Sequence, residues 1–259
     1  MTADHVTNIA VVVPAHNEEA LLPDCLAALR AAVERVRRHV ALVTVHLVLD
    51  ACTDASAAIA AASTLGVSVV NARAVGVART VGVTAALRAH PRVPSSRLWT
   101  AHTDADSVVP AHWLEHQIEL AAAGADVIVG TVRPDFRDLT RAQTDAWWAT
   151  HTPGVANGHV HGANLGIRAS TLLAAGGFDP VPEHEDVRLV DRAAGIGARI
   201  TASDDAWVQT SGRPVGRTAG GYAAYLRKKL VPLAAREVGV TRDGRTTQPD
   251  DASVQAVAG

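Results

Sequence analysis

The chain has 259 residues, a formal net charge of −2 at pH 7 and 48% hydrophobic residues. This length suits one large α/β domain or two small ones with a substantial buried core. The charge balance gives no global electrostatic basis for binding nucleic acid. No apolar run approaches bilayer-spanning length and residues 1–8 lack the parts of a signal peptide, so we expect a cytoplasmic protein. Cys25 and Cys52 alone do not indicate a disulfide framework or a zinc site.

Strands and helices alternate through the first hundred residues. A continuous apolar run over 8–13 predicts a strand that is buried on both faces. Apolar residues then recur at helical spacing over 22–36, with Pro23 tolerated in the first turn. Further strands are expected at 43–49, at 67–70 and from Leu98 onward, and further helices at 56–66 and 75–90. This alternation predicts a parallel sheet with helices on both faces.

The second half of the chain is less regular. We expect helices at 111–123, 169–175 and 183–195, and strands at 126–132, 199–202 and 207–210. Residues 133–158 are expected to be irregular, and a glycine-rich stretch follows at 158–167. The polar end at 241–259 is expected to be disordered.

A basic amphipathic helix is expected at 221–238. Tyr222, Tyr225 and Leu226 fall broadly on one side, and Arg227 heads a basic cluster beside them. This pattern is compatible with peripheral contact at the inner face of a membrane, or with contact to another protein. A helix docked on the core is the alternative, because Pro232 interrupts the pattern.

Two carboxylates one residue apart end the apolar run that begins at Leu98. In an open α/β sheet ligands bind beyond the carboxyl ends of the strands, which is where Asp104 and Asp106 fall. In extended geometry their side chains point to the same side. Paired carboxylates of this kind suit Mg²⁺ or Mn²⁺ that carries a diphosphate. A solvated turn that caps the helix beginning near Pro110 is the alternative.

Four short motifs are informative when they are considered together and in their order along the chain. They are Pro14-Ala15-His16-Asn17-Glu18, Thr103-Asp104-Ala105-Asp106-Ser107, Gly162-Ala163-Asn164-Leu165 and Glu185-Asp186. Together they make the chain resemble family 2 glycosyltransferases of the GT-A fold over about residues 8–200. The resemblance implies a Rossmann-type, mostly parallel sheet in a single domain at 1–240. In it, about 8–110 form the nucleotide-binding half and 111–240 the acceptor-side half.

The resemblance also implies an activity. A sugar would pass from a nucleotide donor, such as a UDP- or GDP-sugar, to the hydroxyl of a glycan, lipid or small molecule, with inversion and with Mn²⁺ or Mg²⁺ on the diphosphate. Carried over by motif, the donor-binding residues are Pro14, Ala15, Asn17, Glu18, Asp50, Arg79, Asp104 and Asp106. The metal ligands are Asp106 and Asp104, and the acceptor side holds Gly162, Ala163, Asn164 and Trp148. Asp186 is the catalytic base, and Glu185 positions it or the acceptor.

Simpler explanations exist for several of these residues. Asn17 and Glu18 suit a helix cap, Asp186 suits one as well, and Arg79 suits an exposed position on its helix. Trp148 belongs to the pair Trp147-Trp148, of which at least one member is expected in the core. The histidines of the later motifs are candidates for phosphate or metal contact or for hydrogen-bonded structural roles, and two arginines are candidates for clamping phosphate. They are His159, His161, His184, Arg213 and Arg217.

The chain departs from the family after the second strand. Many relatives carry Asp-Asp-Gly-Ser there, whereas this chain has Leu49-Asp50-Ala51-Cys52. One carboxylate that would face the base is missing, so the nucleobase stays open. A sugar-phosphate nucleotidyltransferase is an alternative function, although its usual glycine-rich, basic first turn is absent. A catalytically silent nucleotide-sugar binding protein is another, although it would not need Glu185-Asp186.

Overall fold

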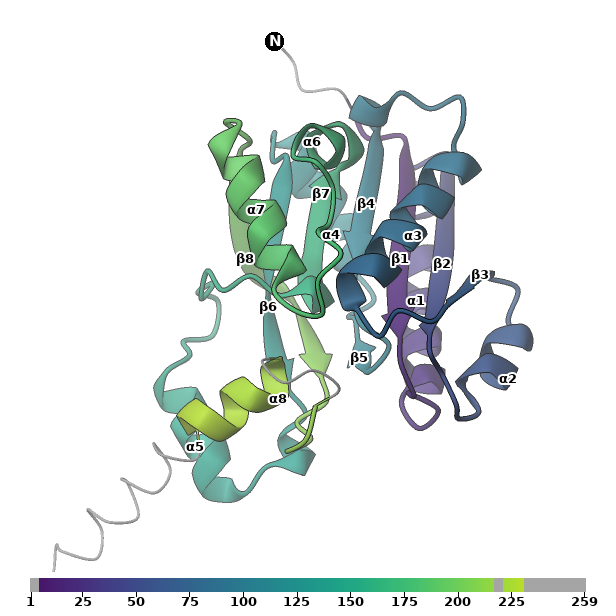
Figure 1. Ribbon diagram of the computed structural model, residues 1–259. Coiled ribbons are helices and arrows are strands. Elements are labelled where there is room, and N and C mark those ends of the chain that lie inside the picture. The colour runs from purple at the N-terminus through teal and green to yellow at the C-terminus, as the bar shows by residue number, and fades with distance from the viewer. Residues whose placement is uncertain (1–4, 217–220, 231–259) are drawn as a thin grey trace, which may run out of the picture.

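The protein is described here from a computed structural model, which covers residues 5–216 and 221–230. Within these residues an eight-stranded sheet has the strand order β3-β2-β1-β4-β7-β6-β8-β5 (Figure 1). The strands are β1 (Asn8–Ala15), β2 (Leu42–Asp50), β3 (Gly66–Val70), β4 (Leu98–His102), β5 (Ser107–Val108), β6 (Val127–Pro134), β7 (Leu165–Arg168) and β8 (Ile200–Thr210). β1, β2, β3 and β4 are mutually parallel, which confirms the arrangement predicted for the first half.

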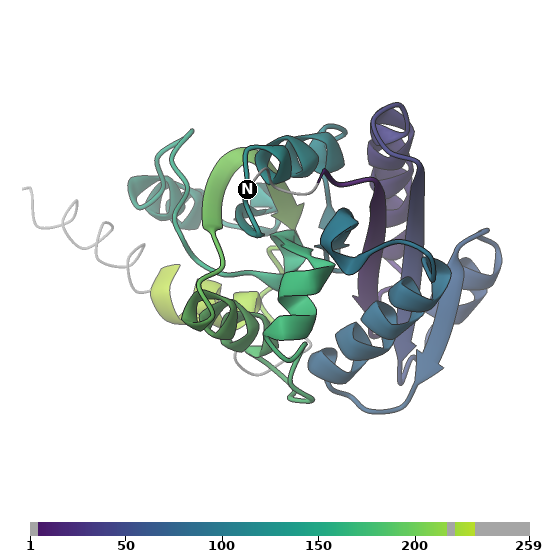
Figure 2. The ribbon, with the colours of Figure 1, turned by 90° about the horizontal axis from the view of Figure 1, so that it is seen from above.

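The first apolar run forms the centre of the sheet. Residues 9–13 are at most 1% exposed, because helices cover both faces of β1. Ile9, Val11 and Val13 lie in the core with α1 (Leu22–Val36) and α4 (Trp113–Ala122). Val12 points to the opposite face, toward α3 (Val75–Ala89) and α7 (Glu185–Gly195), as strand alternation requires. Figure 2 shows these helices on the two sides of the sheet.

β8 is one strand of 11 residues, whereas the sequence predicts two short strands. The interruption in the apolar pattern is Asp204, which is only 6% exposed in the folded chain. Nη2 of Arg133 on β6 donates a hydrogen bond to Oδ2 of Asp204 at 2.6 Å. The acid is therefore accommodated inside the sheet by a partner 71 residues away, and the strand continues through it.

Two elements appear where the sequence pattern predicts an irregular chain. β7 includes the last residues of the glycine-rich stretch and runs antiparallel between β4 and β6. α5 (Arg141–Ala149) begins at a capping box, in which Thr140 and Gln143 each bind the other's backbone N–H. The remaining helices are α2 (Ser56–Ala61), shorter than predicted, and α6 (Ala169–Ala174).

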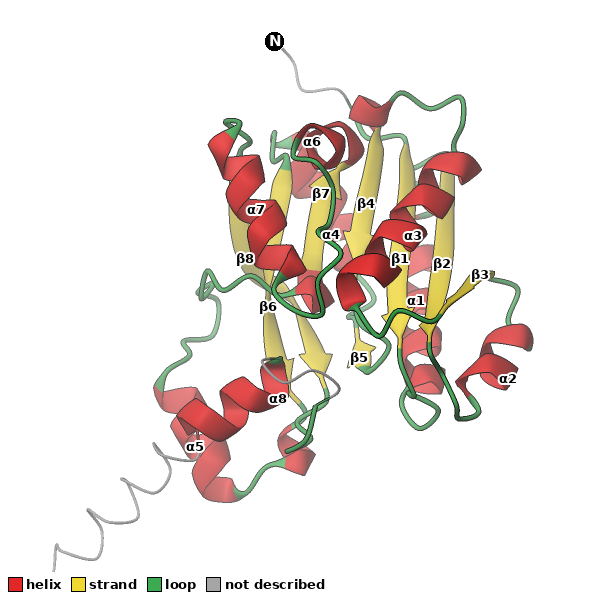
Figure 3. Ribbon diagram, viewed as in Figure 1, coloured by secondary structure: helices red, strands yellow, loops and turns green. Residues whose placement is uncertain are grey.

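A small helical lobe lies beside one end of the main sheet (Figure 3). It contains α5 and α8 (Tyr222–Tyr225), which continues as a π-helical turn over Leu226–Leu230. Leu226 and Leu230 are buried against Trp147 of α5. The described part of the helix expected at 221–238 is therefore docked through its apolar side chains. Residues 231–238 and the tail expected at 241–259 lie outside the described residues, within which no helix has the length and apolar character to cross a membrane.

Candidate active site

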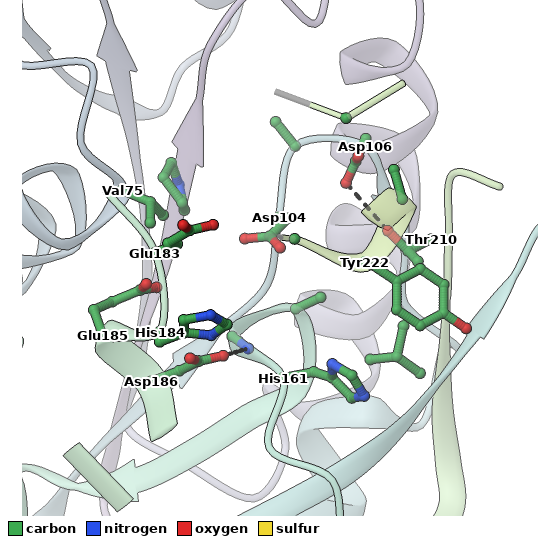
Figure 4. A pocket seen from close by; sticks show the side chains of 18 of the residues that line it. Val75, Asp104, Asp106, His161, Glu183, His184, Glu185, Asp186, Thr210 and Tyr222 are labelled. Carbon is green, nitrogen blue, oxygen red and sulfur yellow. Dashed lines mark hydrogen bonds between the residues drawn. The ribbon is translucent and has the colours of Figure 1, made fainter. Parts of the chain in front are cut away.

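A cavity of about 900 Å³ opens at the carboxyl ends of the parallel strands. This is the place at which open α/β sheets bind ligands. On one side it is lined by strand ends and the turns that follow them, and on the other by the start of α7 and by η3 (Gly162–Asn164) (Figure 4). Of the residues predicted for the site, the cavity lining includes Pro14, Ala15, Glu18, Asp50, Arg79, Asp104, Asp106, Gly162, Ala163, Glu185 and Asp186.

The carboxylate of Asp50 holds a loop. Its Oδ1 accepts hydrogen bonds from the backbone N–H groups of Ala72 (2.7 Å) and Arg73 (2.8 Å), and its Oδ2 accepts one from Ala74 (2.8 Å). These bonds fix the chain between β3 and α3, including Arg73 in the left-handed region with φ 51°. Asp50 thus shapes the cavity wall through the backbone, and its contact with a donor stays a prediction.

The first turn is tied to the turn after β2. Asn17, with φ 55°, accepts a hydrogen bond from the backbone N–H of Thr53 at 2.7 Å. His16 Nδ1 lies 2.6 Å from the backbone oxygen of Asp50. Asn17 does not cap α1, whose N-cap position is Leu21 and has no side-chain hydrogen bond. Asn17 lies outside the cavity lining and acts on it by holding these two turns together.

Arg213 joins two of the predicted donor-binding acids. Its Nη1 and Nη2 donate to the two carboxylate oxygens of Glu18 at 2.8 and 2.7 Å. The same Nη2 donates to Oδ2 of Asp106 at 2.8 Å. The sequence suggests Arg213 as a phosphate clamp, but its pairing with Glu18, 195 residues away, has no local signal.

Asp106 lies in a strongly negative environment. Its side chain is 15% exposed, and burial followed by the charge of Asp104 raises its pKa to about 6. Arg213 and a hydrogen bond that Thr210 Oγ1 donates at 3.2 Å counter this rise only in part. Thr210 lies at the end of β8, and its role could not be read from the sequence, because only the folded sheet brings it to Asp106.

Arg79 links the two sides of the cavity. It is 1% exposed and not on the solvent face of its helix. Its Nη2 donates to Asp104 at 2.6 Å and its Nε to Glu185 at 2.9 Å. Burial raises the pKa of Glu185, and the charge of Arg79 opposes that rise. The guanidinium thus connects the edge of β4 to the first residue of α7, and the role of Glu185 in positioning Asp186 or the acceptor stays a prediction.

Gly162 allows the chain to pass directly over Arg79. A Cβ atom at this position would lie 2.2 Å from Nη2 and 2.8 Å from Cζ of Arg79, which is too close for any side chain. The backbone N–H of Gly162 donates to Oδ2 of Asp186 at 2.6 Å, and Oδ1 of Asp186 accepts from the N–H of Val187 at 2.8 Å. Asp186 is therefore fixed at the start of α7 with its carboxylate in the cavity wall (Figure 4).

The structure gives Asn164 a structural role. Its side chain is 3% exposed and lies outside the cavity lining. Oδ1 accepts from the indole of Trp113 at 2.8 Å, while Nδ2 donates to the backbone oxygens of Thr131 and Ala206, each at 3.0 Å. The amide therefore holds α4, β6 and β8 together, and it is not presented to an acceptor.

Trp148 also lies outside the cavity lining. Its ring is stacked with Phe136 at 5.4 Å, and the guanidinium of Arg133 lies 5.5 Å from its centre. Trp147, the other member of the pair, is buried in the small lobe as the core alternative predicts. The tyrosines that do reach the cavity are Tyr222 and Tyr225, both of which the sequence assigns to the amphipathic helix.

The acids at the end of β4 suit a divalent cation. Asp104 and Asp106 line the same cavity, and carboxylate oxygens are ligands that Mg²⁺ and Mn²⁺ prefer. The raised pKa of Asp106 shows that added positive charge would be favourable there. In the part of the chain that the structure describes, no group of three or more His, Cys, Asp or Glu side chains is arranged as a metal site. A cation here would complete its shell with diphosphate oxygens and water.

The curled, mostly parallel sheet with helices on both faces has the architecture of the GT-A fold. Residues 10–172 match glycosyl transferase family 2, and the chain belongs to this family. No curated protein matches the sequence. The family supports a glycosyltransferase that uses a nucleotide-sugar donor, as the sequence motifs predict.

Solved structures share the fold at low sequence identity. TarS from S. aureus has a TM-score of 0.57 and 17% identity, with 90% of this chain and 40% of that chain covered. A mannosyltransferase from Pyrobaculum calidifontis, in complex with GDP-Man and Mn²⁺, has a TM-score of 0.57 and 20% identity, with 95% and 67% covered. Glucosyl-3-phosphoglycerate synthase from Mycobacterium tuberculosis, in complex with Mn²⁺, UDP-Glc and phosphoglyceric acid, has a TM-score of 0.50 and 16% identity, with 88% and 80% covered.

Proposed function

We propose that this chain transfers a sugar from a nucleotide-sugar donor to an acceptor hydroxyl with inversion at the anomeric carbon. The observation that carries this proposal is the placement of two groups of acids in one cavity. Asp104 and Asp106 follow a parallel strand, and Glu185 and Asp186 open the helix across from them. The family match favours transfer of the sugar over the nucleotidyltransferase alternative.

The strand-end side suits the leaving diphosphate. Asp104 and Asp106 would hold a divalent cation, which when bound supplies positive charge at the diphosphate. Arg213 lies at the same place, where its guanidinium bridges Glu18 and Asp106, and phosphate oxygens would have to replace one of these carboxylates as its partner. These groups favour departure of the nucleoside diphosphate by stabilising the charge that develops on it.

The helix side suits activation of the acceptor. Asp186 lies in the cavity wall and in the first turn of α7, where it is near the positive end of the helix dipole. Its two backbone hydrogen bonds orient the carboxylate and leave lone pairs for a further proton. In the proposed step the acceptor oxygen bonds to the anomeric carbon, its proton passes to Asp186, and the bond from that carbon to the diphosphate breaks with its electron pair.

A thermal stabilisation screen tests the donor class. The full chain would be heated with UDP-, GDP- or dTDP-sugars, each with and without Mn²⁺. We expect one nucleotide series to stabilise the protein in a Mn²⁺-dependent way, by about 2.7 kcal/mol at a hundredfold excess over its dissociation constant. The anomeric configuration of the product, read by NMR, then tests inversion. Absence of stabilisation by every donor, or retention of configuration, would contradict the proposal.

A further inference from the structure

One wall of the cavity is aromatic. His161 and Tyr222 both line the cavity, with ring centroids 5.6 Å apart and planes at 89° (Figure 4). Tyr225 also lines it and stacks on Tyr222 at 5.7 Å, and His159 lies 6.3 Å from His161. In Figure 4 Tyr222 and Glu185 lie on opposite sides of the view, with Asp104 between them. We call His161 and Tyr222 the aromatic wall.

His161 offers hydrogen-bonding atoms to a ligand. Among the described residues it makes ring contacts with Tyr222 and His159, and no hydrogen bond between described residues uses its ring nitrogens. His151, in contrast, places its Nδ1 2.8 Å from the backbone oxygen of Trp147. Burial lowers the pKa of His161 to about 4, so at neutral pH the ring has one N–H donor and one acceptor nitrogen. This combination matches a hydroxyl group, which both donates and accepts.

Tyr222 offers an apolar ring surface. Its hydroxyl oxygen accepts a hydrogen bond from the indole of Trp147 at 3.3 Å, which anchors the polar end of the side chain in the small lobe. Burial raises the pKa of Tyr222, so the phenol stays neutral. An anchored, uncharged aromatic ring in a cavity wall is suited to packing against the C–H groups of a saturated ring.

The charges around the wall select against anions. Among the described residues that line the cavity there are seven carboxylates and three arginines. Arg79 and Arg213, two of those arginines, are each ion-paired with cavity acids. A divalent cation would offset the two phosphate charges of a donor, so the excess of carboxylates would still act on the acceptor. A phosphate or carboxylate group on the acceptor would be repelled.

From these observations we infer that the acceptor presents an uncharged, polyhydroxylated ring, which packs on Tyr222 and exchanges hydrogen bonds with His161. The inference rests on the proposed function, because it names the substrate class for the acceptor side of that site. It assigns acceptor specificity to His161, which the sequence offers for phosphate or metal contact or for a structural role, and to Tyr222, which the sequence assigns to the amphipathic helix.

Matched acceptors test the inference. Release of nucleoside diphosphate from the stabilising donor would be measured with Mn²⁺ and the full chain, first with water alone. Uncharged methyl glycosides would then be compared with the 6-phosphate and the uronic acid of the same ring. We expect at least one uncharged glycoside to raise the rate about tenfold or more, and its anionic counterparts to give no comparable increase. Stimulation by the anionic compounds, or by none of the rings while water still supports release, would overturn the inference. No release under any condition would overturn the proposed function as well.

Variants of the aromatic wall give a second, independent readout. His161→Phe keeps a ring but loses both hydrogen bonds, and Tyr222→Leu removes the aromatic surface. We expect each to raise the acceptor KM about tenfold, with a smaller change in the donor KM. Tyr222→Phe keeps the ring and should retain an acceptor KM close to that of the wild type. The control is His39→Phe, because His39 is exposed and lies outside the cavity lining. Unchanged acceptor KM in folded His161→Phe and Tyr222→Leu would overturn the inference.

Discussion

Replacement of Asp106 by Asn should stabilise the metal-free protein while it removes cation-dependent donor binding. The side chain of Asp106 is 15% exposed and lies near two other carboxylates, Asp104 and Glu18. Burial and these charges raise its pKa from 3.8 to about 6, against the opposing effect of Arg213. The folded state therefore binds the proton of Asp106 more tightly than the unfolded chain does.

The size of the effect follows from the two pKa values. A rise of about 2 units corresponds to about 3 kcal/mol at pH values where the carboxylate is ionised in both states. Below pH 3.8 the group is protonated in both states and contributes nothing. As the pH rises from 3.8 to 6, ionisation of Asp106 lowers the free energy of unfolding progressively. About half of the full 3 kcal/mol is lost at pH 5. An amide does not ionise, so Asp106→Asn should unfold with a free energy up to about 3 kcal/mol higher than the wild type at pH 8.

Urea unfolding in EDTA at pH 5 and pH 8 measures this difference. Asp191→Asn, an exposed acid on α7, is the control and should show little change at either pH. Calorimetry with Mn²⁺ and the stabilising donor measures binding by the same variants. If Asp106→Asn is no more stable than the wild type at pH 8, or if its stability gain is the same at both pH values, the electrostatic account of this site is wrong. Unchanged Mn²⁺-dependent donor affinity would contradict the assignment of Asp106 as a metal ligand.

Two substitutions near the cavity and one binding assay of the unchanged chain give three further predictions. Gly162→Ala should lower the free energy of unfolding by about 1–3 kcal/mol, because the new Cβ displaces the buried guanidinium of Arg79; urea unfolding measures this. Asn164→Ala should cost about 2–4 kcal/mol in the same assay, because it leaves an indole N–H and two backbone oxygens without their partner. In liposome flotation at low salt, the full chain should be recovered equally with neutral and anionic vesicles, because Tyr222–Leu230 buries its apolar side chains against α5.

For each of these three predictions, a specific result would contradict the structural reasoning. Wild-type stability of Gly162→Ala would show that Arg79 can move without cost, and Ala163→Gly next to it controls for backbone changes in η3. Wild-type stability of Asn164→Ala would remove its role in joining α4, β6 and β8. Preferential recovery on anionic vesicles would support the peripheral membrane contact that the basic cluster at Arg227 suggests.

Most of the sheet could be predicted because its signals are local. The apolar run at 8–13 and the glycine and proline boundaries of the helices depend on neighbouring residues, and they gave the correct elements through β4. β8 was predicted as two strands because Asp204 interrupts the pattern, and only the tertiary contact with Arg133 shows why an acid fits there. β7 is short, and its partners β4 and β6 are far away in the sequence.

In the candidate site, too, local motifs predict the placement of residues, whereas their tertiary contacts could not be predicted. The family motifs brought the expected acids to one cavity, since they lie at strand ends and at the start of α7. The motifs did not reveal what those acids bind in the folded chain. Asp50 holds three backbone N–H groups, and Glu18 pairs with Arg213. Asn164 has the residue type of an acceptor ligand, yet its partners lie on three other elements and bury it.

In the proposed reaction Asp186 removes the proton of the acceptor hydroxyl. Asp186→Asn keeps the shape of the side chain, and its amide oxygen can still accept the hydrogen bond from the N–H of Gly162, but it cannot take up the proton. With the donor and acceptor identified by the screens above, single-turnover transfer should fall by about 10²–10⁴ while donor affinity stays close to that of the wild type. Transfer within a few-fold of the wild-type rate would show that Asp186 only binds the backbone N–H groups of Gly162 and Val187, and that the base must be sought elsewhere.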